Sequence, residues 1–150
     1  MTNSPVWHPF TQHGLGEPIP SVTHALGAVI HTADGRRIID GISSWWVTTH
    51  GHCHPQIMAA IAKQTERLDQ VIFAGWTHEP AETLARDLLA MMPDELSRVF
   101  YSDSGSTSVE VALKMALGYW ANRGAPRDRI LVMEHSYHGD TIGAMSVGAR

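Results

Sequence analysis

The chain has 150 residues, of which 43% are hydrophobic, and eleven Lys and Arg against fifteen Asp and Glu give it a formal charge of −4. This composition predicts a folded globular chain and excludes a disordered one. There is no basic run, so nucleic acid is not expected as a partner. Neither a membrane span nor a signal peptide is expected, because no run of 18 apolar residues and no leader pattern is present. The single cysteine, Cys53, fits a reducing cytoplasm.

The start of the chain predicts an irregular arm followed by a β-hairpin. Residues 1–24 are rich in Pro, Gly and His and are expected to be irregular. Apolar runs at 28–32 and 37–42 then flank the pair Asp34-Gly35. An Asp-Gly pair between two such runs is typical of a hairpin turn.

Three amphipathic helices are predicted from the spacing of apolar residues. The first starts at Pro55. The second covers 80–92, because proline is favourable at a first helical position and Pro93 stops the helix. The third covers 107–123, and Gly124 ends it. Their apolar stripes are Ile57, Ile61 and Leu68, then Leu84, Leu88 and Met91, then Val109, Leu113, Ala116, Leu117 and Trp120.

Two short apolar runs flank the third helix and predict β-strands. RVFYS at 98–102 precedes the helix, and RILVM at 129–133 follows it. Strand, helix and strand in this order form a βαβ unit, which implies a parallel sheet covered by helices. Thr107 and Glu110 have the spacing of a capping box at the start of the helix.

The turn that leads into this helix, YSDSGSTSVE, is a candidate anion site. The first N–H groups of a helix have no partner within it and the dipole there is positive, so an anion is stabilised. Gly105 lets backbone approach a ligand, and Ser104, Ser106 and Thr107 add hydroxyl groups. The same residues also make an ordinary helix cap. Neither the dinucleotide fingerprint nor the P-loop spacing is present.

Two other stretches carry side chains suited to a flat ligand. Tyr137 and His138 follow the second predicted strand, where a ring could stack on a cofactor and an imidazole could orient it or move protons. A polar loop that turns at Gly139 is the alternative. The adjacent Trp45 and Trp46 either line an apolar pocket or pack in a core.

Three histidines and the cysteine lie close together in HGHCHP at 50–55. Zinc prefers such ligands, but consecutive residues do not readily converge on one tetrahedral centre. No second pair with zinc spacing is present, although His135 and His138 are three positions apart. We therefore predict no metal site.

Three motifs in this order resemble the class III aminotransferases, which are pyridoxal-phosphate enzymes of fold type I. The motifs are DGISSWWVTTHGHCHPQI, SDSGSTSVEVALKMA and YHGDTIGAMS, and the resemblance extends from about Trp7 over nearly the whole chain. It implies an α/β fold and a homodimer. Residues 1–50 would be the N-terminal segment of the small domain, and 51–150 the start of the large domain, which has a mainly parallel sheet and binds pyridoxal 5′-phosphate. In this family Gly-His-x-His-Pro leads into a helix, so the histidine cluster is expected to be structural.

The resemblance also implies roles for individual residues. Gly105 and Ser106 would bind the cofactor phosphate, and Tyr137 would stack on the pyridine ring, with His138 beside it. The substrate pocket would be lined by Phe10, Trp45, Trp46 and Tyr137. Phe10 stands where the most similar members have Tyr, so this chain keeps a stacking face and loses a hydroxyl that could hydrogen-bond substrate.

No catalytic residue is expected within residues 1–150. The family holds its cofactor on a lysine, and this chain has two lysines only: Lys63, on the charged side of the first predicted helix, and Lys114, in the middle of the third. We therefore expect a truncated chain that is inactive alone, with the catalytic lysine further along a longer protein.

Within the family, the segment WHPFT at 7–11 and the double tryptophan are similar to the members that act in biotin biosynthesis. Those members move an amino group from S-adenosylmethionine to 8-amino-7-oxononanoate. One alternative is a class III aminotransferase for an ω-amino acid or a diamine, against which the double tryptophan argues. The other is a non-catalytic chain that binds a phosphate ligand or a partner subunit.

Overall fold

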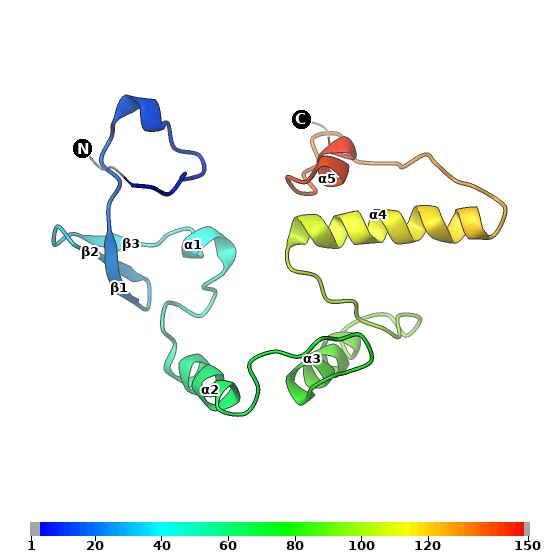
Figure 1. Cartoon of the computed structure of the whole chain (residues 1–150), viewed down its shortest axis with the longest axis horizontal. Coiled ribbons are helices and arrows are strands. Elements are labelled where there is room, and N and C mark those ends of the chain that lie inside the picture. The colour runs from blue at the N-terminus through cyan, green and yellow to red at the C-terminus, as the bar shows by residue number, and fades with distance from the viewer. Residues whose placement is uncertain (1–3, 149–150) are drawn as a thin grey trace. The chain divides into compact units, whose positions relative to one another are not determined.

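The computed structural model describes residues 4–148, and the chain divides at residue 76 into two units. The expected boundary near residue 50 concerns the domains of the family fold and stays a prediction. The first unit contains η1 (His13–Leu15), β1 (Val22–Leu26), β2 (Val29–Thr32), β3 (Arg37–Ile39), α1 (Ser43–Trp46) and α2 (Pro55–Thr65). The second contains α3 (Glu79–Leu89), α4 (Gly105–Asn122) and α5 (Ile142–Ser146) (Figure 1).

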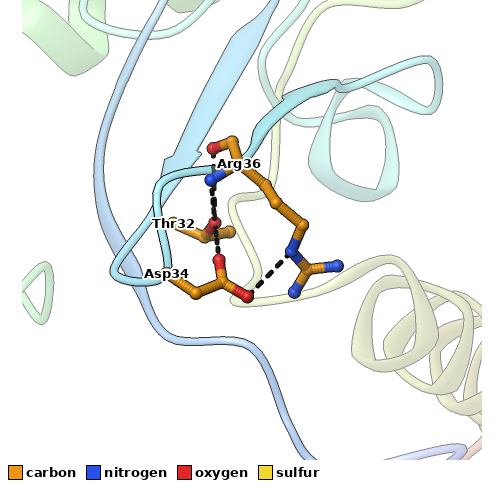
Figure 2. Close-up of polar contacts among 3 residues, drawn as sticks. All are labelled: Thr32, Asp34 and Arg36. Carbon is orange, nitrogen blue, oxygen red and sulfur yellow. Dashed lines mark hydrogen bonds and ion pairs between the residues drawn. The ribbon is translucent and has the colours of Figure 1, made fainter.

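The first unit is built on an antiparallel sheet with the strand order β1-β2-β3. The predicted hairpin is confirmed, since β2 and β3 pair on either side of the turn that contains Asp34 and Gly35. Gly35 has a φ of 84°, which a glycine adopts without strain. Figure 2 shows how side chains close this turn: the Thr32 hydroxyl and Arg36 Nε both donate to the Asp34 carboxylate, the latter over 2.8 Å.

Strand β1 lies partly in the segment that was expected to be irregular. It begins at Val22 and pairs with β2, with a register irregularity between Val22 and His24. The short sequence VTHAL gives too little alternation to predict a strand, and pairing with β2 decides its conformation. Beyond β1, Gly27 forms two backbone hydrogen bonds with His52, of 3.0 and 2.8 Å, and so ties the histidine segment to the sheet.

The three predicted helices are confirmed as α2, α3 and α4, and α3 ends three residues earlier than expected. Their apolar stripes are largely exposed: Ile57, Ile61, Leu84 and Leu117 are all solvent-exposed. Within its own unit of the described residues, neither α2 nor α3 packs against another helix or strand, and the buried apolar residues of 4–148 are Ala144 and Val147. An open hollow of 440 Å³ follows the apolar face of α4. None of the helices in residues 4–148 is long and apolar enough to cross a membrane.

The two strands predicted at 98–102 and 129–133 are not strands in the structure. An extended segment becomes a strand only when a neighbour completes its hydrogen-bond ladder. In the described part of the chain neither segment has such a neighbour, and the Leu131 side chain is fully exposed. The parallel pairing that the βαβ pattern predicted is therefore absent between residues 4 and 148.

Candidate functional site

The N-terminus of α4 is capped by its own sequence. Ser104 is the N-cap residue, and its hydroxyl accepts the Thr107 N–H over 3.1 Å. The Thr107 hydroxyl in turn accepts the Ser104 N–H over 3.0 Å, which completes a capping box. The capping box predicted for Thr107 and Glu110 is therefore wrong, because it lies one turn too late. The N–H groups of Gly105 and Ser106, at the first two helical positions, point out of the helix end.

An acidic side chain stands beside this helix end. The Asp103 carboxylate accepts the Thr107 hydroxyl over 2.7 Å. This hydroxyl is the main cause that lowers the pKa of Asp103, followed by the residue's own backbone N–H and by Ser102. Asp103 is thus ionised at neutral pH and belongs to the capping network.

The loop that follows residue 135 lies against the first turn of α4. Ser106 Oγ accepts the Asp140 N–H over 3.0 Å, across 34 positions of sequence. A Cβ built at Gly139 would lie 2.7 Å from Ser106 Cα, and Gly139 has a φ of 132°, so the position requires glycine. The Tyr137 hydroxyl donates to Asp140 Oδ2 over 2.7 Å. The structure thus brings Gly105 and Ser106 next to the loop that carries Tyr137 and His138.

Glu110 fastens the same loop one turn further along α4. Its Oε1 accepts the N–H of Gly143 over 2.7 Å and of Ala144 over 3.3 Å, at the start of α5. The Thr141 hydroxyl, followed by Gly143 N–H, lowers the pKa of Glu110. This role of Glu110 was not predicted, because the sequence pattern placed the residue in the helix cap. Gly143 was the available signal, since its missing Cβ leaves room for the carboxylate.

A cavity of 240 Å³ opens beside this loop. Tyr137, His138 and Gly139 line it from the loop, and Ala144 and Met145 line it from α5. Its volume is below the range of about 300–1,000 Å³ that is typical of complete small-molecule pockets. The cavity therefore has room for only part of a small-molecule ligand.

In the first unit the structure brings together two residues that the sequence analysis assigned to substrate. The rings of Phe10 and Trp45 stack with a centroid distance of 5.6 Å and an interplanar angle of 25°. Trp45 and Trp46 are 68% and 81% exposed, so they do not pack in a core. These exposed aromatic faces are available to a ligand.

The segment that carries both tryptophans is a left-handed turn. Ser43, Ser44, Trp45 and Trp46 have φ values of 49°, 45°, 65° and 71°. Left-handed helical backbone costs about 1–2 kcal/mol for each residue with a side chain. Such strain persists only where the surrounding structure holds it. The hydrogen bond from Trp46 N–H to Ile42 O, of 2.9 Å, closes this turn.

A hydrogen-bonded pair of largely covered side chains, Asp40 and His52, lies beside the turn. Asp40 Oδ2 accepts His52 Nε2–H over 2.7 Å and the Ser44 hydroxyl over 2.7 Å. The side chains of Asp40 and His52 are only 4% and 16% exposed. The Ser44 backbone N–H, the Ser44 hydroxyl and His52 lower the pKa of Asp40 to about 2, so the carboxylate is ionised at neutral pH. A structural role was expected for the histidine segment at 50–55, but the sequence did not predict that Asp40 is the partner of His52.

The remaining members of the histidine segment do not converge. The rings of His50 and His54 meet edge to face at 6.2 Å, and Cys53 is exposed. Across residues 4–148 no three side chains of His, Cys, Asp or Glu are arranged to hold a metal ion. Lys114 is nine positions beyond Gly105, which is about 14 Å along a helix, so it does not reach the helix end.

The family is shown by comparison with known proteins. The family model for class III aminotransferases matches residues 11–150. Two relatives named adenosylmethionine-8-amino-7-oxononanoate aminotransferase come from Synechococcus elongatus and Corynebacterium glutamicum. They are 56% and 46% identical to this chain over 97% and 95% of its length. The chain spans about a third of these proteins, with 34% and 33% of their lengths matched.

Solved structures show the same fold. The adenosylmethionine-8-amino-7-oxononanoate aminotransferase of Methanocaldococcus jannaschii is 34% identical, with a TM-score of 0.90 over 96% of this chain and 34% of that one. An amine transaminase from an uncultivated Pseudomonas species, solved in its PLP-bound form, is 35% identical, with a TM-score of 0.87 over 98% and 34%. The fold is thus that of part of a fold type I transaminase, as the three motifs predicted. On these matches, the chain belongs to the class III aminotransferase family.

Proposed function

We propose that the protein containing this chain is a pyridoxal 5′-phosphate-dependent aminotransferase. It moves an amino group from S-adenosylmethionine to 8-amino-7-oxononanoate and yields 7,8-diaminononanoate for biotin biosynthesis. The names of the relatives from Synechococcus elongatus and Corynebacterium glutamicum support this substrate pair. The observation that carries the proposal is the hydrogen bond from Asp140 N–H to Ser106 Oγ, which holds the tyrosine loop at the start of α4.

The residues at this helix end fit a phosphate dianion. The N–H groups of Gly105 and Ser106 lie at the positive end of an 18-residue helix. Apart from its two neighbours and the backbone of the helix itself, nothing lies within 4 Å of the point where a Gly105 Cβ would stand, so a ligand can approach the backbone there. Ser106 Oγ accepts a hydrogen bond from Asp140 and so keeps its own proton to donate to a phosphate oxygen.

Tyr137 and His138 then border the cofactor ring in our proposal. The Tyr137 ring is exposed on the loop, and its hydroxyl is oriented by Asp140. When bound, pyridoxal phosphate supplies the electron sink that lets an amino group leave one carbon and join another. The chain's own residues orient that group, and Trp45, Trp46 and Phe10 offer aromatic faces to the apolar part of the substrate. The catalytic lysine belongs to the part of the protein outside residues 1–150.

The homodimer and the domain assignment belong to the same proposal. We assign residues 1–50 to the small domain and 51–150 to the cofactor domain, with a second subunit completing the active site. Exposed apolar stripes on α2 and α3 are consistent with burial against further protein. The exposed free thiol of Cys53 is compatible with a cytoplasmic location.

Half-reactions of the full-length protein test the substrate assignment. We expect S-adenosylmethionine to bleach the absorbance of the bound cofactor, and 8-amino-7-oxononanoate to restore it. Ser106→Ala should weaken cofactor binding. Gly118→Ala, on the same helix, is the matched control because a Cβ there meets no atom.

A second candidate activity is the transamination of an ω-amino acid or an amine. Two observations favour it: the likeness to the Pseudomonas amine transaminase, and Phe10, which cannot donate a hydrogen bond to a polar substrate. It is the correct assignment if an ω-amine bleaches the cofactor and S-adenosylmethionine does not.

A further inference from the structure

We infer that Asp40 and His52 are positioning residues, whose hydrogen-bonded pair holds the left-handed turn and thereby fixes the orientation of Trp45 and Trp46. The consequence for substrate recognition rests on the proposed function, in which these tryptophans face the acceptor. The effect on the turn itself does not depend on it.

Both members of the pair are anchored to the sheet. Asp40 directly follows β3, and its N–H donates to Ala28 O over 2.9 Å. His52 exchanges two backbone hydrogen bonds with Gly27. A Cβ at Gly51 would lie 3.0 Å from Gly27 Cα, so the two backbones are in direct contact. The carboxylate and the imidazole are therefore held by separate segments that the hairpin fixes in place.

The pair acts on the turn through Ser44. Its hydroxyl donates to Asp40 Oδ2 over 2.7 Å, and its backbone N–H helps to lower the pKa of this carboxylate. Ser44 is the second of four successive residues with positive φ. Since such backbone is unfavourable for residues with side chains, it relaxes when the group that holds it is removed. Without the carboxylate, the two indole rings would leave their present orientation.

The stacking of Trp45 on Phe10 links the orientation of the indole ring to substrate recognition. Phe10 and Trp45 meet at 5.6 Å, and Phe10 has no hydroxyl with which to bind a polar group. The stacked ring faces therefore offer apolar surface, and how much of it a ligand meets depends on how the rings are turned. The substrate that depends on them is a keto acceptor with a long aliphatic chain, because its methylene groups would pack on these rings.

A first experiment detects a change in the conformation of the turn by NMR, without measuring activity. The full-length protein is labelled with 5-fluorotryptophan, and the fluorine resonances of Trp45 and Trp46 are assigned by substituting each with Phe. We expect Asp40→Asn to shift both resonances. Asp34→Asn is the matched control, since Asp34 also binds a hydroxyl and a cation but lies in the hairpin turn (Figure 2). The inference is overturned if Asp40→Asn leaves both resonances in place or if Asp34→Asn moves them equally.

A second experiment measures how well the full-length protein recognises the keto acceptor, from KM and kcat. We expect Asp40→Asn to raise KM for the aliphatic keto acceptor about tenfold to a hundredfold, and to change kcat less than twofold, because positioning is lost and no reacting group is removed. His52→Ala should act in the same way. His52→Gln should recover most of the loss, since the Gln amide can place an N–H where Nε2 donates to Asp40.

The outcomes separate this inference from the proposed function. A fall in kcat with an unchanged KM, or a His52→Gln variant as poor as His52→Ala, contradicts the positioning role. If no acceptor of the proposed class reacts with the parent protein, the substrate assignment fails, and the fluorine resonances still decide whether the pair holds the turn. Should Asp40→Asn not fold, the two His52 variants answer both questions.

Discussion

At the scale of single residues, two glycines decide how the tyrosine loop docks on α4. A side chain at Gly139 would collide with Ser106, and one at Gly143 would collide with the Glu110 carboxylate. Sequence analysis identified Gly139 as a turn residue only and gave Gly143 no role. The reason is that close approach across more than thirty positions leaves no local pattern.

Gly143→Ala should therefore destabilise the full-length protein. The new methyl group displaces Glu110 from the N–H groups of Gly143 and Ala144, and such overpacking typically costs about 1–3 kcal/mol. Urea unfolding measures this. Gly118→Ala, in mid-helix with open space around it, should instead stabilise by about 0.5–1 kcal/mol. Equal midpoints for the two variants would contradict the Glu110 contact.

A second residue-scale prediction concerns acid stability. The rings of His24 and His31 stack across β1 and β2 at 4.2 Å. Partial burial, then His24 and Arg37, lower the pKa of His31 below its ordinary value of 6.5. The folded chain thus binds fewer protons than the unfolded chain, so the contribution of His31 to stability is complete above pH 6.5 and falls as the pH drops below it.

His31→Gln should reduce the loss of stability between pH 7.5 and pH 5.5. The loss is measured as the shift in the urea midpoint of unfolding between these two pH values. His135→Gln is the control, because that side chain is 89% exposed. An identical pH dependence in the parent and in His31→Gln would show that His31 does not titrate as described.

At the scale of elements, the start of α4 has two roles that can be separated. Ser104→Ala removes the acceptor of the Thr107 N–H and should cost about 1 kcal/mol of stability. Ser104→Asp keeps an acceptor at the N-cap but adds a negative charge where the phosphate is proposed to bind. We expect it to unfold at nearly the parent's urea concentration and to bind pyridoxal phosphate more weakly. Unchanged cofactor affinity in Ser104→Asp would place the phosphate elsewhere.

The helices and the hairpin of β2 and β3 could be predicted from this sequence, whereas β1 was missed and the strands predicted at 98–102 and 129–133 do not form, for a physical reason. The helical stripes of α2, α3 and α4 repeat every three or four residues, so each is visible within its own segment. The segment at 129–133 has the apolar content of a strand, but a strand also needs a partner, and its partner is not specified locally. The left-handed turn at Ser43–Trp46 was equally hidden, since nothing in SSWW favours positive φ without Asp40.

At the scale of the whole molecule, the family could be predicted from three ordered motifs, although the predicted parallel pairing does not form within residues 4–148. Motifs report on a site that is shared by relatives, whereas the core depends on all segments that pack around it. The apolar faces of α2, α3 and α4 are largely exposed within the described residues. The motifs therefore predict the family of the chain, but they do not predict how its core is packed.

An isolated polypeptide of residues 1–150 should bind the dye ANS strongly and show no transaminase activity. The exposed faces provide apolar surface for the dye. Of the two lysines, Lys63 is in the last turn of α2, and Lys114 is in the middle of α4, nine positions beyond Gly105. The full-length protein is the comparison in both assays. Turnover by the isolated polypeptide would contradict the assignment of the catalytic lysine to another part of the protein.

The contact between Gly27 and the histidine segment has a consequence for amide hydrogen exchange. The N–H groups of Gly27 and His52 are both bound across this contact, 25 positions apart in sequence. Opening of the contact exposes both at once, so their deuterium uptake rates should rise and fall together. Mass spectrometry of the two peptides that contain Gly27 and His52 would thus measure how often this contact opens, and with it the segment that holds the turn of Trp45 and Trp46.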